Sequence, residues 1–292
     1  MPRPETVSDG ETVSDGFVRV GGTAVHVRRE GWGPVCVLSG GLGCSWFDWD
    51  PVVPLLAPCR TVVRFDRPGY GLSEPERGRP TAVGEVERIR TVLDALGLPG
   101  PCTVAGHSLA GFHVEAFARL HPGRTAGLVL LDAGVEPAPH PLPAPGLRDL
   151  GARAVAGTAT ALAVPYLFGP AGRRLAARLN TVRGTDPAPA GLVRRCYRPG
   201  RALRAALREN ACYLDVAAEL AELRARAPLP EVPVTVLAAD PGCGTPASRR
   251  WLARQQALAE LLGARFRVAV PAGHLLMADR PDVVAQAVLD SS

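Results

Sequence analysis

The sequence contains no lysine: all 33 of its basic side chains are arginines. They outnumber the 28 acidic residues, which gives a formal net charge of +5, but acidic residues are interspersed throughout and no block of five like charges occurs. Aromatic residues make up only 5% of the chain and are scattered. Because nucleic-acid sites combine clustered basic residues with interleaved aromatic ones, we expect no nucleic-acid partner.

Long apolar runs are also missing. Although 47% of the residues are hydrophobic, no uninterrupted run reaches the 18 residues that a membrane-spanning helix requires. The first ten residues, MPRPETVSDG, hold no apolar segment of the kind that secretory signals carry. These features predict a globular, cytoplasmic protein with no membrane partner.

Paired cysteines are absent as well. The seven cysteines are odd in number and form no C-x-x-C motif, whereas zinc sites and disulfide frameworks depend on paired spacing. We therefore expect no metal and no other cofactor, and most cysteines should be small buried apolar residues.

The polar hexamer ETVSDG occurs twice in succession, at residues 5–10 and 11–16. The repeat follows neither the helical nor the strand period, so residues 1–16 are predicted to form a flexible arm.

Beyond residue 17, short β-branched apolar segments alternate with helical patterns. Continuously apolar strands of this kind indicate a mostly parallel sheet that is covered by helices on both faces. The expected strands span residues 17–20, 23–29, 34–38, 60–65, 102–105, 127–131, 233–238 and 265–270, and the expected helices 45–57, 81–97, 108–121, 246–263 and 281–290.

One long stretch interrupts this alternation. About a hundred residues between Leu131 and Pro233 show no strand pattern; they begin with EPAPHPLPAPG and continue as amphipathic helices, including residues 201–226. We interpret the stretch as an inserted all-helical cap. The predicted division is a core of residues 17–133 and 231–292 and a cap of residues 134–230.

The segment PCTVAGHSLAGFHVE, residues 101–115, places Ser108 between an expected strand and an expected helix. Gly106 and Ala110 flank it at two positions either side, so that strand and helix can approach closely. This is the pattern of the nucleophile elbow, G-x-S-x-G, with alanine replacing the second glycine. A serine at a helix start is also a common N-cap, which is the structural alternative.

Two further loops support the catalytic interpretation. In SGGLG, residues 39–43, glycines let the backbone turn toward the elbow, so that the amides of Gly41 and Leu109 would form a two-donor oxyanion hole. In PAGHLL, His274 follows the last strand, at the carboxyl edge where open α/β sheets bind ligands.

The segments SGGLG, DRPGYGLS, GHSLAG and GHLLMADRP occur here in an order and spacing that resembles the α/β-hydrolase family, over residues 17–290. The resemblance implies that Ser108 is the nucleophile, that His274 is its base, and that Gly41 and Leu109 form the oxyanion hole. It also implies that the helical cap covers a pocket for a small-molecule substrate. Serine in place of aspartate at the elbow disfavours the dehalogenase and epoxide-hydrolase branches.

A serine–histidine pair needs a carboxylate to orient the imidazole, and two candidates are open. Asp240 follows the expected strand 233–238 but comes two residues before the position that the family most often uses, which Gly242 occupies. Asp132 directly follows the strand next to the elbow. We favour Asp132, while either aspartate keeps the chain order Ser–Asp–His.

These features predict a serine hydrolase that cleaves an ester, thioester or lactone of a hydrophobic small molecule through an acyl-enzyme. Two alternatives share the fold. One is a lyase, cyclase or acyltransferase of small-molecule biosynthesis, and the other is a ligand-binding protein without catalysis.

Overall fold

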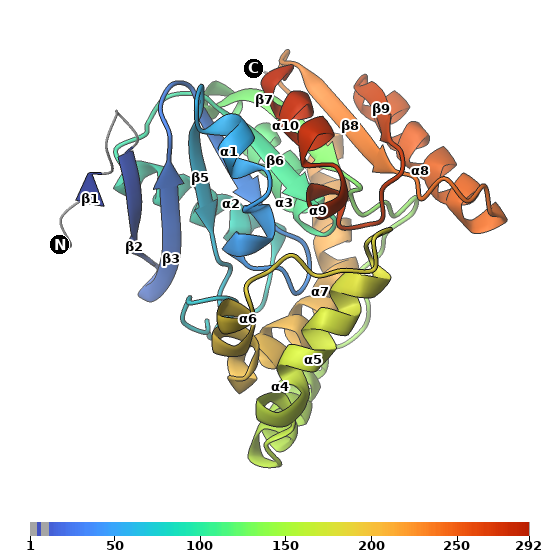
Figure 1. The fold of residues 1–292 in the computed structure, drawn as a ribbon. Helices are drawn as coiled ribbons and strands as arrows, with labels where there is room; N and C mark the ends of the chain where they lie inside the picture. Colours follow the sequence, from blue (N-terminus) through green and yellow to red (C-terminus); the bar gives the residue numbers. More distant parts are fainter. Residues whose placement is uncertain (1–4, 7–11, 292) are drawn as a thin grey trace.

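A nine-stranded sheet forms the centre of the computed structural model, which describes residues 5–6 and 12–291 (Figure 1). The strand order is β1-β2-β3-β5-β4-β6-β7-β8-β9, antiparallel from β1 to β5 and parallel from β5 to β9. The strands are β1 (Glu5–Thr6), β2 (Thr12–Val20), β3 (Thr23–Glu30), β4 (Val35–Ser39), β5 (Thr61–Phe65), β6 (Cys102–His107), β7 (Thr125–Leu131), β8 (Val234–Ala239) and β9 (Arg265–Ala269).

The structure differs from the prediction at the amino-terminal arm. Residues 12–16 are not a flexible segment but the first half of β2, which pairs with β3 from Ser14, opposite Arg29, onward. The Asp15 carboxylate also lies 2.8 Å from Nε2 of the buried His26. Backbone pairing with a neighbouring strand thus orders a polar segment whose sequence lacks a strand pattern. The remaining arm residues, 1–4 and 7–11, lie outside the described residues.

Helices cover both faces of the sheet, as the sequence predicts. On one face, α2, α3 and α8 pack into a large apolar cluster, and on the other α1 and α10 form a second cluster with α9. The helices of the core are α1 (Val53–Leu56), α2 (Ala82–Ala95), α3 (Ala110–Leu120), α8 (Pro246–Leu262), α9 (Leu276–Asp279) and α10 (Pro281–Leu289).

The segment between β7 and β8 consists of four helices and no strand among its described residues, which confirms the predicted helical insertion. In Figure 1, α4 and α5 project away from one end of the sheet, while part of α7 runs back toward it. Val216, Leu220 and Leu223 of α7 belong to the main apolar cluster, so this helix anchors the cap to the core. The cap helices are α4 (Pro145–Ala161), α5 (Val164–Leu179), α6 (Ala190–Tyr197) and α7 (Gly200–Arg226).

Within the described residues, no single helix is both long and apolar enough to cross a membrane; α4 and α5 together would qualify by length and composition, but they meet at a bend of 106°.

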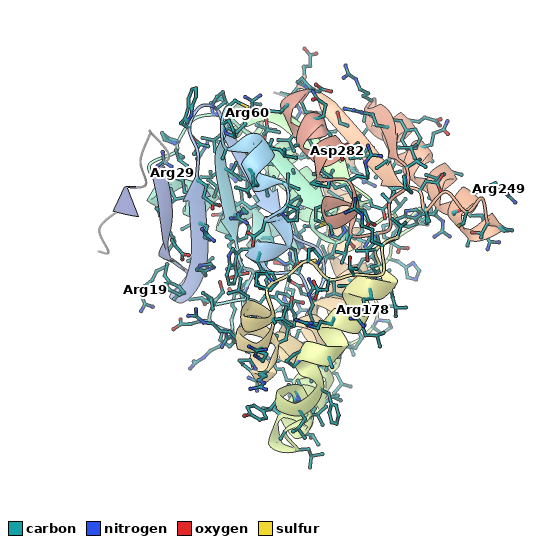
Figure 2. The ribbon with its side chains drawn as sticks, viewed as in Figure 1. Arg19, Arg29, Arg60, Arg178, Arg249 and Asp282 are labelled. Carbon is teal, nitrogen blue, oxygen red and sulfur yellow. The ribbon has the colours of Figure 1, made fainter. Side chains whose placement is uncertain are left out.

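The arginine side chains are distributed over many elements. Figure 2 labels Arg19 on β2, Arg29 on β3, Arg60 before β5, Arg178 on α5 and Arg249 on α8. The positive charge is therefore carried by separate parts of the surface and not by one helix or strand.

Candidate active site

Ser108 lies on a sharp turn between β6 and α3 and has a left-handed backbone conformation, with φ of 54°. A side chain at Gly106 would come within 2.4 Å of the Ala110 carbonyl oxygen, so the close approach of strand and helix requires glycine there. The Ser108 amide donates to the Leu131 carbonyl at 3.0 Å, which fixes the turn to the neighbouring strand. A strained, anchored serine of this kind is the feature that distinguishes a nucleophile elbow from an ordinary N-cap.

His274 joins this serine to a carboxylate. Its Nε2 lies 3.0 Å from the Ser108 Oγ, and its Nδ1 lies 2.6 Å from Oδ2 of Asp132. The three side chains come from loops after three strands, β6, β7 and β9, at one edge of the sheet. The structure thus brings together all three residues of the favoured triad in hydrogen-bonding order.

The second Asp132 oxygen is also occupied. Oδ1 accepts hydrogen bonds from the Ala239 amide at 2.9 Å and from the Trp251 indole at 2.7 Å. This buried carboxylate therefore has three donors, which fix its rotation and stabilise its charge. The sequence reasoning did not identify Trp251, because α8 carries it far from any motif.

Asp240, the other candidate acid, serves a different purpose. Its Oδ1 accepts the Gly242 amide at 2.9 Å, and its backbone bonds to Ala269 and Ala272. The side chain thus closes the turn after β8 and makes no contact with His274, so the geometry favours Asp132.

Gly41, one of the two predicted oxyanion-hole donors, lies beside Ser108. A Cβ added at Gly41 would lie 2.8 Å from both the Ser108 Cβ and the His107 Nδ1, so only glycine allows this loop to pack against the elbow. Neither the Gly41 amide nor the Leu109 amide donates a hydrogen bond to another group in the described part of the chain. Both are therefore free to bind an oxygen at the elbow.

A buried ion pair supports this loop from behind. Arg67 donates to the carbonyl oxygens of Gly40 and Gly41, the latter at 2.8 Å from Nη2, and its Nε and Nη2 donate to Glu209 of α7 at 2.6 and 2.9 Å. The Tyr70 hydroxyl donates to the same carboxylate at 3.0 Å. A charged group of the cap thus holds the arginine that orients the Gly41 peptide.

His107, the neighbour of Ser108, stays uncharged. Burial, with a contribution from His274, lowers its pKa well below the usual value. Its Nε2 lies 2.8 Å from the His274 carbonyl oxygen, to which a neutral ring can donate. The ring thereby ties the elbow to the loop that carries His274.

A cavity of about 400 Å³ opens over the serine, between the elbow and the cap. Ser108, His274, Leu42, Cys44, Arg173 and Tyr197 are among its lining residues. Burial raises the pKa of the Cys44 thiol to about 12, so this cysteine is not a competing nucleophile. No cluster of three or more His, Cys, Asp or Glu side chains in the described residues is arranged to hold a metal ion.

Comparison with curated proteins gives short matches. A "Putative carbamate hydrolase RutD" of Variovorax paradoxus is 34% identical over 110 residues, which are 37% of this chain and 41% of that protein. A "Pimeloyl-[acyl-carrier protein] methyl ester esterase" of Aeromonas hydrophila is 36% identical over 110 residues, 36% of this chain and 40% of that protein. The chain spans less than half the length of these curated relatives, and only 16–17% of two other curated proteins that it matches.

Solved structures match over nearly the whole chain. Cfl2 from Burkholderia cenocepacia superposes with a TM-score of 0.77 at 22% identity, covering 99% of this chain and 98% of that one. An enol-lactonase from Burkholderia xenovorans gives a TM-score of 0.65 at 24% identity, with 94% and 98% covered. At these identities the likeness establishes the fold. A sequence family described as "Alpha/beta hydrolase family" matches residues 36–287, a span that includes Ser108, Asp132 and His274, and the chain belongs to this family.

Proposed function

We propose that the protein is a serine hydrolase that cleaves an ester, thioester or lactone of a hydrophobic small molecule, with residues 134–230 as the cap over its substrate. The observation that carries the proposal is the unbroken hydrogen-bond chain from the Ser108 Oγ through both nitrogens of His274 to Asp132. A hydroxyl needs such a base, and the base needs such a carboxylate, to become a nucleophile at neutral pH.

In the proposed first step, the Ser108 Oγ attacks the carbonyl carbon while the His274 Nε2 takes the hydroxyl proton. Asp132 holds the proton on Nδ1, so that Nε2 is the basic nitrogen, and it stabilises the imidazolium that forms. His274 then gives its proton to the departing alcohol or thiol as the tetrahedral intermediate collapses to the acyl-enzyme. Water, deprotonated by His274, attacks the acyl carbon, and the proton returns to the Ser108 oxygen as the acid leaves.

The carbonyl oxygen becomes negatively charged in both steps. The amides of Gly41 and Leu109, which donate to no other group in the described part of the chain, would donate to that oxygen. Preorganised backbone donors of this kind are worth about 3–4 kcal/mol each in acyl transfer. The relatives named for methyl ester and enol-lactone cleavage support the choice of substrate class.

Replacing Ser108 by alanine tests the proposal. We expect kcat for p-nitrophenyl butyrate to fall by about 10⁴- to 10⁶-fold, because the acyl-enzyme can no longer form. In parallel, a fluorophosphonate should label the wild-type protein once, at Ser108, as read by intact mass and peptide mapping. An active protein whose Ser108 is not labelled by the fluorophosphonate would instead favour a lyase, cyclase or acyltransferase that uses the pocket without an acyl-serine.

A further inference from the structure

A second cavity, of about 290 Å³, lies between the cap and the core next to the catalytic one, and it is open to solvent at Val164 and Phe168. The side chains of Val164, Pro165 and Phe168 from α5 and of Leu203 and Ala206 from α7 line it. Its wall is almost entirely apolar, and Arg173 is its single charged lining residue. None of the proposed catalytic residues reaches this chamber, so the proposed mechanism leaves it without a role.

The two cavities adjoin each other at four shared residues, Gly43, Gly172, Arg173 and Tyr197. Two of these are glycines on opposite sides: Gly43 on the loop beside the oxyanion hole and Gly172 on α5. A Cβ added at either position would meet no atom within 4 Å, so both glycines face open space. Neither glycine therefore adds side-chain bulk to the boundary between the two cavities.

The other two residues present apolar surfaces at the junction because their polar atoms are occupied. The Tyr197 hydroxyl donates to the Gly43 carbonyl oxygen at 2.6 Å. The Arg173 guanidinium binds Asp48, lies 3.4 Å from Asp186, and packs on the Tyr197 ring at 5.6 Å. With two carboxylates neutralising it, this arginine does not select an anionic substrate, and a hydrocarbon can pass the ring without desolvating a free polar group.

We propose that the apolar chamber is a substrate subsite that holds the unbranched alkyl arm of the ester while its carbonyl group lies at Ser108. The inference rests on the proposed hydrolase function and adds the substrate class, a medium- or long-chain alkyl ester. The shared boundary with the catalytic cavity identifies the occupant, because an alkyl chain that extends from Ser108 past Gly43 and Gly172 would reach the chamber. Burying each further methylene should raise kcat/KM about fourfold, until the chamber is full.

The first test is a chain-length series measured below the aggregation concentration of each ester. For the wild type, kcat/KM should rise on the order of 10²-fold from the C6 to the C10 chain. Two ester series, p-nitrophenyl acyl esters and alkyl acetates, show whether the acyl or the alkoxy side of the ester carries the long alkyl chain. The rise in kcat/KM with chain length should appear in one of the two series.

Gly172→Leu is the informative variant, because it adds a bulky side chain at a residue that lines both cavities. Leucine favours the helix more than glycine does, so loss of folding is not expected. The rise from C6 to C10 should shrink to less than about threefold. Gly151→Leu is the matched control, since Gly151 is also an exposed helical glycine with open space around it, on α4 and away from both cavities, and should keep the wild-type rise. A Gly172→Leu protein with an unchanged chain-length dependence would overturn the proposal.

A binding measurement separates this proposal from the hydrolase assignment. Wild-type protein titrated with 1-decanol should bind it, and Ala206→Phe, which fills the chamber, should weaken binding at least tenfold. If the wild type hydrolyses no ester but shows this binding pattern, the hydrolase assignment fails and the alkyl subsite stands. If the wild type does not bind decanol, or Ala206→Phe binds it equally well, the subsite is refuted.

Discussion

The Asp132 side chain makes more hydrogen bonds than the side chain of either other residue of the proposed triad. Its Oδ1 accepts from the Ala239 amide and the Trp251 indole, and only Oδ2 is left for the imidazole of His274. This division of the two oxygens fixes which one faces the histidine and in what plane. Since effective general-base catalysis depends on that orientation, the donors behind the carboxylate bear on the rate as directly as the carboxylate itself.

Two aspartate variants distinguish the acids that the sequence left open. Asp132→Asn should lower kcat by about 10⁴-fold, because the amide favours the wrong imidazole tautomer and carries no charge. Asp240→Asn, whose side chain accepts only the Gly242 amide, should stay within about threefold of wild type. Ester turnover of the two purified variants measures both. An equal loss in the two would contradict the assignment of Asp132.

Trp251→Phe removes one hydrogen bond to Asp132 while keeping an aromatic ring. A hydrogen bond to a charged group contributes about 1.5–3 kcal/mol, so kcat/KM should fall by about 10- to 100-fold. Steady-state kinetics of the purified variant measure the loss. An unchanged kcat/KM would mean that the indole hydrogen bond does not position the carboxylate.

At the scale of elements, α7 connects the cap to the loop that contains Gly40 and Gly41. Glu209 on this helix binds Arg67, which in turn holds the Gly40 and Gly41 carbonyl oxygens. Breaking a buried pair on one side leaves an uncompensated charge in the interior. The same change should loosen the loop of Gly41, whose amide is one of the two proposed oxyanion donors.

Glu209→Gln should therefore lower the free energy of unfolding by about 3 kcal/mol and reduce kcat more than it changes KM. Glu222→Gln is the control, because Glu222 lies on the same helix with its side chain exposed, and it should change stability by less than about 0.5 kcal/mol. Urea denaturation and steady-state kinetics measure the two effects. A stability loss with unaltered kcat would show that the pair does not position the loop.

The buried helix α3 contains a histidine that should make the fold sensitive to acid. Burial lowers the pKa of His113 from 6.5 to about 3, so between these pH values the unfolded chain binds a proton that the folded one does not. Stability should therefore fall as the pH falls below about 6.5, by up to about 1.4 kcal/mol per pH unit for this group. Urea denaturation at pH 7.5 and 5.0 measures the free energy of unfolding at each pH. The change between the two pH values should be smaller for His113→Gln than for the wild type, whereas His140→Gln, at an exposed histidine, should retain the wild-type change.

Over the whole molecule, the sequence predicts the features that depend on neighbouring residues, namely strands, helices and the loops that follow strands. The alternation of apolar strands and helices predicted the sheet, and the loops around Ser108, Gly41 and His274 follow strands that end at one edge of it. The choice between Asp132 and Asp240 depends on which loop turns toward His274, and both follow strands, so sequence alone favoured one without excluding the other. Trp251 and Glu209 lie on helices without a motif, and only the folded arrangement brings them to Asp132 and Arg67.

The cap and the core should unfold together. Although α4 and α5 project from the sheet, α7 buries Val216, Leu220 and Leu223 in the main apolar cluster and carries the buried Glu209. The four tryptophans, at 32, 46, 49 and 251, all lie outside the cap, whereas the cap helices α4–α7 supply a large share of the helical circular dichroism signal. Urea transitions followed by tryptophan fluorescence and by far-ultraviolet circular dichroism should therefore have the same midpoint. A dichroism midpoint at lower urea would show instead that the cap melts first, and that the contacts of α7 do not couple it to the sheet.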